Sequence, residues 1–407
     1  MATVVLVGTL DTKGHEYAFL RERLMEHGVE VVVIDVGVGD PLAIRPEVSG
    51  EEVAEAAGTS RASLTAAGDR GAAMDAMGRG AAAIVGRLHG QGRCDGVLAT
   101  GGSGGTSVAT RAMQALPVGV PKLMVSTMAS GNVRPYVGAV DIAMMHSVVD
   151  IAGINQVSSR ILGNAAAAIA GMALAEPPAL GSPRPLVGAT MFGVTTAAVT
   201  AARERLEELG YEVLVFHATG AGGQSMEALA RDGFLAGVLD LTTTELCDDL
   251  VGGVLSAGPD RLEAAGELGL PQVVSVGALD MVNFGPRDTV PAEFEHRNLY
   301  VHNPTVTLMR TTPEETGELG RRIAAKLNRA TGPVALYLPL RGVSAIATEG
   351  QPFHDPAADE ALFDALRSGV DPDVVKLEER DTHINDTAFA HEAADALHAM
   401  ITAAPRR

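Results

Sequence analysis

Residues 176–185, Glu-Pro-Pro-Ala-Leu-Gly-Ser-Pro-Arg-Pro, divide the chain into two parts. Four prolines in ten residues cannot continue a helix or a central strand, so this segment is predicted to be a linker. On both sides of it, short β-branched runs alternate with longer stretches of helical periodicity. This alternation is typical of βα units built around parallel sheets. The sequence therefore predicts two Rossmann-like α/β domains, 1–180 and 181–407, each with a mainly parallel sheet flanked by helices.

Apolar runs predict five strands before the linker and six after it. The predicted strands are Thr3–Val7, Glu30–Asp35, Gly96–Thr100, Lys122–Thr127, Ala139–Met145, Leu186–Thr190, Glu212–His217, Gly237–Asp240, Gln272–Val276, Val334–Leu338 and Val374–Leu377. One pattern, Arg-Glu-Arg-Leu followed by a glycine and an apolar strand, occurs at both 21–35 and 203–217. Two βα units can converge on such a pattern. A duplication would explain it equally well and would predict two sheets of similar topology.

The charge balance excludes several classes of partner. Lys and Arg total 31 against 50 Asp and Glu, a formal net charge of −19. Nucleic acid and anionic membranes attract basic surfaces, so neither is expected as a partner. The N-terminus lacks a signal-peptide pattern, and the longest apolar stretch, Ala165–Ala175, is too short to cross a bilayer. Only two cysteines, Cys94 and Cys247, are present, which suits a reducing compartment. We therefore expect a soluble, cytoplasmic protein.

The strongest local signal is the glycine-rich turn Gly-Gly-Ser-Gly-Gly-Thr at 101–106, which follows an apolar strand and opens a predicted helix. Glycines let the backbone approach an anion, and the free amides and positive end of a helix favour phosphate or carboxylate. Ser103 and Thr106 add hydroxyl donors. The spacing matches neither the Walker A motif nor the Rossmann fingerprint, so it predicts an anion without naming a nucleotide. A tight strand-to-helix turn without a ligand is the alternative.

The first βα turn, 8–14, brings Asp11, Thr12 and Lys13 to the carboxyl edge of the predicted sheet. A lysine beside hydroxyl groups suits phosphate, and an aspartate suits Mg²⁺ or a ribose hydroxyl. Asp35, at the end of the second predicted strand, holds the position of a ribose-binding acid, and helix capping explains it equally well. A third polar loop, 126–134, would complete a pocket with these two.

The second half has its own set of polar loops. Residues 217–227 again predict a strand end, a glycine-rich turn and a helix start, which indicates a second anion site. Histidines gathered at one sheet edge act as general bases or metal ligands. The candidate catalytic residues are His217, His302, Arg341 and His383. No histidine pair has a short metal-ligand spacing, so metal ligands stay unknown, and a capping or surface role is the alternative for each histidine taken singly.

Five motifs together resemble one protein family. They lie at Val7–Gly14, Gly101–Thr106, His217–Glu227, Arg297–Thr307 and Leu338–Ser344. In this order they resemble the Tm-one-like ATP-binding family, a largely uncharacterised group that includes the inhibitory N-terminal domain of a tomato mosaic virus resistance protein. The likeness spans nearly the whole chain. It implies two Rossmann-like subdomains, a homodimer, and ATP with Mg²⁺ held by the N-terminal half.

Carried over residue by residue, the resemblance implies where ATP would bind. The implied residues are Asp11, Thr12, Lys13, Gly102, Ser103, Gly104, Gly105, Thr106, Thr127, Ser130 and Gly131. The virus-inhibiting role belongs to one plant member and is not implied for this chain. We expect an ATP-dependent enzyme acting on a small anionic metabolite at the domain cleft. The alternatives are a non-catalytic nucleotide sensor whose dimer ATP stabilises and, on fold class alone, a dinucleotide-dependent oxidoreductase.

Overall fold

The computed structural model describes residues 1–176 and 184–404. Their contacts divide the chain into two units, Met1–Ala179 and Leu180–Arg407, called unit 1 and unit 2 below. Most of the predicted linker, and the predicted boundary between 180 and 181, lie outside the described residues. Each unit has its own sheet and its own hydrophobic core.

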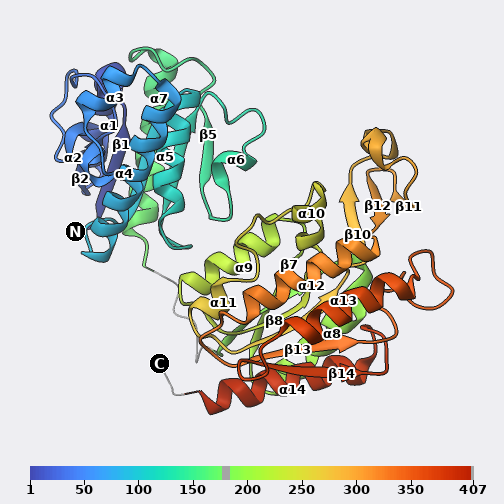
Figure 1. The fold of residues 1–407 in the computed structure, drawn as a ribbon. Helices are drawn as coiled ribbons and strands as arrows, with labels where there is room; N and C mark the ends of the chain where they lie inside the picture. Colours follow the sequence, from blue (N-terminus) through green and yellow to red (C-terminus); the bar gives the residue numbers. More distant parts are fainter. Residues whose placement is uncertain (177–183, 405–407) are drawn as a thin grey trace. The chain divides into compact units, whose positions relative to one another are not determined.

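Unit 1 contains a five-stranded parallel sheet in the order β2-β1-β3-β4-β5, with helices on both faces (Figure 1). Its strands are β1 (Thr3–Gly8), β2 (Glu30–Asp35), β3 (Gly96–Gly101), β4 (Lys122–Ser126) and β5 (Ala143–His146). Its helices are α1 (Leu10–Glu26), α2 (Gly50–Ala56), α3 (Arg61–Ala67), α4 (Arg70–Gly90), α5 (Ser103–Gln114), α6 (Arg134–Val137) and α7 (Gln156–Leu174).

The two faces of this sheet are covered by different helices. Val4 and Leu6 of β1 belong to the apolar cluster formed with α1 and α7, whereas Val5 and Val7 belong to the cluster formed with α4 and α5. This alternation follows from the two-residue period of a strand. The helices after the neighbouring strands β1 and β3 therefore leave toward opposite faces. Ligands of doubly wound sheets bind at such a switch point, beyond the carboxyl ends of the strands.

Helix α7 is longer than the apolar stretch that marked it in the sequence. It has 19 residues and the hydropathy of a membrane-spanning helix, and 33% of its most apolar 18 residues are buried within the protein. Its residues Ala165, Ala166 and Ile169 pack in the same cluster as β1. Apolar core helices share this length and hydropathy, and α7 covers one face of the unit 1 sheet.

Unit 2 contains a six-stranded parallel sheet in the order β14-β13-β9-β8-β6-β7 and a small antiparallel sheet, β10-β12-β11. Its strands are β6 (Leu186–Met191), β7 (Glu212–His217), β8 (Leu235–Thr242), β9 (Gln272–Gly277), β10 (Met281–Phe284), β11 (Leu299–Asn303), β12 (Val306–Arg310), β13 (Val334–Pro339) and β14 (Val375–Arg380). Its α-helices are α8 (Thr196–Glu208), α9 (Ala221–Arg231), α10 (Glu245–Val251), α11 (Ala264–Glu267), α12 (Pro313–Leu327), α13 (Pro356–Gly369) and α14 (Thr387–Ala403).

Both parallel sheets have one strand order. Counted from the first strand of each unit, the order is second, first, third, fourth, fifth, and unit 2 adds a sixth strand at the end. The similar topology that a duplication would predict is therefore present. The α/β class with mainly parallel sheets is confirmed, and the switch point of unit 2 lies between β6 and β8.

Several elements were not predicted from the sequence. The antiparallel sheet β10-β12-β11 is inserted between β9 and β13 and projects from the rest of unit 2 (Figure 1). Its strands have only four or five residues, too few for a clear periodicity. The sequence predicts a helix at His15–His27. Helix α1 begins earlier, at Leu10, and its first turn is separated from the rest by Lys13, whose φ of −124° and ψ of 17° are not helical.

Candidate functional site

The glycine-rich turn of unit 1 ends in an uncapped helix. Gly102 is the N-cap of α5, and no side chain there accepts a hydrogen bond from the first turn. The first bond of the helix runs from the N–H of Thr106 to the carbonyl of Gly102, at 2.9 Å. Helices leave their first amides without an internal partner, so those of Ser103, Gly104 and Gly105 are available to an external acceptor. Since α5 follows β3, these amides lie at the switch point of the sheet.

Two glycines of this turn lie in close packing. A Cβ atom at Gly101 would lie 3.1 Å from the Cα of Gly105, and one at Gly104 would lie 3.2 Å from the Met74 methyl group. Gly102 is different, because a Cβ there would meet only the Thr127 hydroxyl oxygen, at 3.8 Å. The turn is therefore held in a close approach at both ends and is open at the N-cap.

Thr106 serves the turn itself. It is fully buried, and its hydroxyl lies 2.8 Å from the Gly102 carbonyl and 2.6 Å from the Ser126 hydroxyl at the end of β4. The Thr127 amide donates to the Gly101 carbonyl at 3.3 Å, which brings the loop after β4 beside the glycine-rich turn. Thr127 is half-buried, while Ser130 and Gly131 farther along that loop are exposed. The predicted proximity of these two loops is confirmed, but Thr106 has no surface to offer a ligand.

Tyr17 bridges the two strands of the switch point. Register pairing between β1 and β3 ends at Leu6 and Leu98, and the Tyr17 hydroxyl takes over beyond that point. It donates toward the carbonyls of Val7, at 2.6 Å, and Thr100, at 3.0 Å, and accepts from the Thr100 amide at 2.9 Å. Burial raises the pKa of this phenol, so it stays protonated. Its ring fills the space that a side chain at Gly8 would need.

The residues predicted in the first βα turn have separate tasks. The Asp11 carboxylate accepts from the Gly39 amide at 2.9 Å and so fixes the loop after β2. The Thr12 hydroxyl is exposed and contacts Thr9. The Lys13 ammonium donates to the carbonyl of Ile151, in the loop between β5 and α7. Of the three side chains, only that of Thr12 is largely exposed.

Asp35 acts as a cap. It is 1% exposed, and its Oδ1 accepts from the amide of Leu10 at 3.1 Å and of Gly37 at 2.8 Å. The carboxylate therefore stabilises the N-terminus of α1, which is the capping alternative left open by the sequence. Burial raises its pKa, and the two amide hydrogen bonds oppose that rise. Its Oδ2 has no hydrogen-bond partner among the described residues, and a ribose-binding role stays a prediction.

One cation beside the turn was missed in the sequence. Arg70 is the first residue of α4, and its Nη2 lies 3.5 Å from the position of a Cβ on Gly104. Its side chain is exposed and makes no ion pair or hydrogen bond within the described residues. No local signal marks it, because only the packing of α4 against α5 brings it to the turn.

The glycine-rich turn of unit 2 is already occupied by the protein's own carboxylate. Glu245 Oε1 accepts from the amides of Gly220, at 2.7 Å, and Gly223, at 3.0 Å, at the start of α9. Its other oxygen accepts from Arg261 Nε at 2.6 Å, and Arg261 also donates to both oxygens of Asp240. All three of these charged side chains are buried. The predicted repeat of an anion site is therefore present in form, with an internal anion in it.

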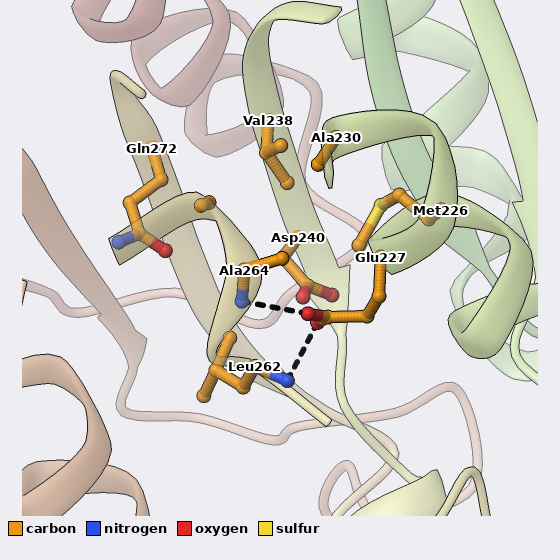
Figure 2. Close-up of a pocket in the computed structure, with 9 residues that line it drawn as sticks. Met226, Glu227, Ala230, Val238, Asp240, Leu262, Ala264 and Gln272 are labelled. Carbon is orange, nitrogen blue, oxygen red and sulfur yellow. Dashed lines mark hydrogen bonds between the residues drawn. The ribbon is translucent and has the colours of Figure 1, made fainter. Parts of the chain in front are cut away.

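A third carboxylate joins this buried group. Glu227 accepts from the amides of Leu262 and Ala264, both at 2.7 Å, and Figure 2 shows its carboxylate pointing toward that of Asp240. Burial raises the pKa of Glu227, and the neighbouring Asp240 adds to the rise. The cavity between them leaves about 10 Å³ for a solvent molecule, which is about the least that holds one water. This group stabilises the unit from within and leaves no room for a metabolite.

The four candidate catalytic residues of unit 2 do not form one cluster. His217 ends β7, and Arg341 and His383 follow β13 and β14 at the other end of the sheet. Five strand spacings separate β7 from β14, about 24 Å. Arg341 pairs with Asp381 at 2.5 Å, and both are exposed. His302 lies on β11 of the projecting antiparallel sheet. Their catalytic roles stay predictions.

The described residues contain no ready-made metal site. Among residues 1–176 and 184–404, no three His, Cys, Asp or Glu side chains are arranged to hold a metal ion. Mg²⁺ that arrives with a nucleotide is commonly held by phosphate, water and one or two carboxylates, so this result does not test the predicted Mg²⁺. Asp11 belongs to the first βα turn of unit 1, and its Oδ1 has no hydrogen bond within the described residues.

The fold and these loops define a protein of two doubly wound α/β units, each with a glycine-rich turn at the carboxyl edge of its sheet. The chain belongs to the uncharacterised protein family UPF0261: residues 2–178 match the N-terminal domain of that family and residues 184–401 its C-terminal domain.

Relatives from bacteria and a plant extend over most of the chain. A UPF0261 protein of Clostridium tetani is 56% identical over 398 residues, 98% of each chain. The ToMV resistance protein Tm-1 of Solanum lycopersicum is 41% identical over 414 residues, which are 97% of this chain and 55% of the tomato protein. The Tm-one-like resemblance is thereby confirmed. An S. aureus MnaA-UDP co-structure, 12% identical over 100% of this chain and 99% of that one, has a TM-score of 0.23, which supports no inference about activity.

Proposed function

We propose that unit 1 binds ATP, with Mg²⁺, at the glycine-rich turn between β3 and α5. The observation that carries this proposal is the N-terminus of α5, where a glycine N-cap leaves three amides without an acceptor. Free amides and the positive end of a helix stabilise a phosphate without any basic side chain. This explains how a chain of net charge −19 can attract an anion.

The surroundings of the turn fit a phosphate-bearing ligand. The backbone approaches closely at Gly101 and Gly104, and the exposed hydroxyls of Thr12, Ser103 and Ser130 offer further donors. The Thr100 hydroxyl, two residues before the N-cap, is buried without a hydrogen-bond partner in the described structure. Asp11 would contribute to holding Mg²⁺ through its unbonded oxygen. Bound Mg²⁺ neutralises phosphate charge and orients the terminal phosphate.

The proposal can be tested by introducing a carboxylate at the turn that would compete with ATP for the free amides. Gly102→Asp places an N-cap carboxylate over the free amides, as Glu245 lies over those of α9. Gly102 has a φ of −81° and space for a side chain, so the variant should fold and gain stability. We expect its ATP affinity, measured by isothermal titration calorimetry with Mg²⁺, to fall at least about tenfold. Ser107→Asp, one turn along α5, adds the same charge away from the amides and is the matched control.

Two outcomes would contradict the proposal. One is a wild-type protein that binds no ATP at millimolar concentration. The other is a Gly102→Asp variant that folds and binds ATP as tightly as the wild type.

We further propose that the bound ATP drives a reaction on a small anionic metabolite. Polar side chains at the carboxyl edge of the unit 2 sheet support this, since catalytic groups of such folds lie there. Purified protein should consume ATP when a substrate from a panel of carboxylic and sugar acids is supplied. Replacing His217, His302 or His383 by Ala should then stop turnover and leave ATP binding unchanged.

A nucleotide sensor is the second candidate, and one observation favours it. His217 ends β7 at one side of the unit 2 parallel sheet, and Arg341 and His383 follow β13 and β14 at the other side, so these three do not share one reaction centre. In a sensor, ATP would change the homodimer implied by the family resemblance. Light scattering with and without ATP should then show a change in dimer affinity, and the three histidine substitutions should have no effect on it.

A further inference from the structure

The cation predicted for the ATP site is engaged elsewhere in unit 1. Lys13 is the basic residue that the sequence assigns to phosphate, but its ammonium donates to the carbonyl of Ile151. That contact and the bond from the Gly153 amide to Glu16, at 2.7 Å, join α1 to the loop between β5 and α7. The Lys13 ammonium therefore helps to hold α1 against the loop between β5 and α7.

Arg70 lies beside the turn instead. Its Nη2 is 3.5 Å from the position of a Cβ on Gly104, the second residue of α5. Met74, one turn farther along α4, contacts the same position at 3.2 Å and fixes the two helices against each other. The neighbouring carboxylate of Asp69 is directed to the Ala72 amide, at 3.0 Å, where it caps α4. Within the described chain, no other side chain engages the Arg70 guanidinium.

We propose that Arg70 binds the phosphate groups of the ligand at the glycine-rich turn and so selects for a ligand that carries more than one phosphate. This inference rests on the proposed function, because it concerns the same site. A first phosphate occupies the amides of Ser103, Gly104 and Gly105, and the adjacent phosphate meets the guanidinium. A planar guanidinium forms two parallel hydrogen bonds to phosphate, which an ammonium group cannot do.

A second observation supports a ligand at this turn. Thr100 is 2% exposed, and its hydroxyl has no hydrogen-bond partner among the described residues, although buried hydroxyls are usually paired. It lies at the end of β3, the strand that leads into the turn. An unpaired buried hydroxyl and three free amides thus lie within a few residues of one glycine-rich turn, and the unpaired Arg70 packs beside it.

The test compares two arginines of one helix. Arg70→Ala and Arg87→Ala each remove an exposed guanidinium from α4, but their positions differ by 17 residues, about 25 Å along the helix. With ATP and Mg²⁺ in calorimetry, Arg70→Ala should weaken binding at least about tenfold, and Arg87→Ala should not. Arg70→Lys should restore only part of the loss. Circular dichroism should show that all three variants unfold like the wild type.

A readout beyond affinity separates phosphate binding from a structural effect. If Arg70 meets phosphate, the dependence of ATP affinity on salt concentration should become shallower in Arg70→Ala. If Arg70→Ala binds ATP with wild-type affinity while Gly102→Asp does not bind it, the role of Arg70 is wrong and the ATP site stands. If the wild-type protein binds no ATP, both proposals are wrong. If Arg70→Lys binds like the wild type, a simple point charge suffices and the two-bond geometry is wrong.

Discussion

The two glycine-rich turns of this protein look alike in sequence and differ in what faces their amides. In unit 1, the N-cap of α5 is Gly102 and no side chain caps the helix. In unit 2, Glu245 occupies the amides of Gly220 and Gly223. Glycines at the start of a helix therefore provide the backbone geometry of an anion site, but they do not decide whether an external anion can bind there. Whether that site is open depends on a residue elsewhere in the chain.

The switch points differ in the same way. In unit 1, the neutral hydroxyl of Tyr17 joins β1 and β3 through their backbones. In unit 2, Thr190 donates to Asp240 at 2.6 Å, and Asp240 is paired with Arg261, so the space between β6 and β8 holds an ionic network. Unit 2 thus uses its polar groups for its own stability, whereas unit 1 keeps a group of amides available.

The largest effect should come from removing the internal anion of unit 2. Glu245→Ala leaves Arg261 with one partner fewer and leaves the Gly220 and Gly223 amides unsatisfied in the interior. Breaking a buried pair in this way lowers the free energy of unfolding by about 3–5 kcal/mol. Urea unfolding followed by circular dichroism measures it. Glu204→Ala on the exposed side of α8 is the control and should change stability by less than about 0.5 kcal/mol. Equal stability of Glu245→Ala and wild type would refute the difference between the turns.

A pair of alanine substitutions compares the space available for a side chain at the two glycine-rich turns. A Cβ at Gly223 would lie 2.1 Å from Glu245 Oε2 and 2.7 Å from Arg261 Nε, whereas the nearest atom to a Cβ at Gly102 is 3.8 Å away. Overpacking a buried site costs about 1–3 kcal/mol, so Gly223→Ala should lose about 3 kcal/mol. Gly102→Ala should lose less than about 1 kcal/mol. Thermal unfolding measured by calorimetry gives both values, and similar losses in the two variants would contradict an open turn in unit 1.

The pH dependence of stability should fall mainly on unit 2. Burial raises the pKa of Asp248 to about 7 and of Asp280 to about 6. A raised carboxyl pKa means that the folded state binds the proton more tightly, so this stability is present below the ordinary carboxyl pKa and is lost as pH rises toward 7. We therefore expect the free energy of unfolding to fall as the pH rises from 4 to 7.

Hydrogen–deuterium exchange across this pH range, corrected for its intrinsic pH dependence, assigns the loss to one unit. Peptides of α10 and β10 should lose protection relative to those of β1 and β3. Asp248→Asn mimics the protonated carboxyl and should flatten the profile. An equal decline in both units, or an unchanged profile in Asp248→Asn, would show that this carboxyl does not control stability.

Much of the fold was accessible from the sequence because its signals are local. The repeated βα pattern at 21–35 and 203–217 predicts strands and helices that the structure contains, and the two sheets share a strand order. The short strands β10, β11 and β12 escaped prediction because four or five residues carry too little periodicity. The first turn of α1, before Lys13, was not predicted, because its Leu10 amide is bound by Asp35, 25 residues away.

The candidate site was predictable only in part for a related reason. The turn at 101–106 was found from its glycines, but Arg70 was not, because it reaches Gly104 only through the packing of α4 on α5. Lys13 looked like a phosphate ligand beside Thr12, and its ammonium instead contacts Ile151, 138 residues later in the chain. The residue type determines which interactions a side chain can make, but tertiary packing determines which partner it meets.

The sequence by itself determined where the backbone turns sharply, where helices begin after strands, and that two α/β units exist, since each of these follows from residues within one or two turns of chain. The tertiary structure decided which helix start is free and which is filled. Glu245 lies 25 residues from Gly220, and no local rule states whether its carboxylate reaches that amide. Anion sites are made of backbone amides that every helix possesses. Whether another side chain of the protein already binds those amides depends on the packed fold and not on the motif.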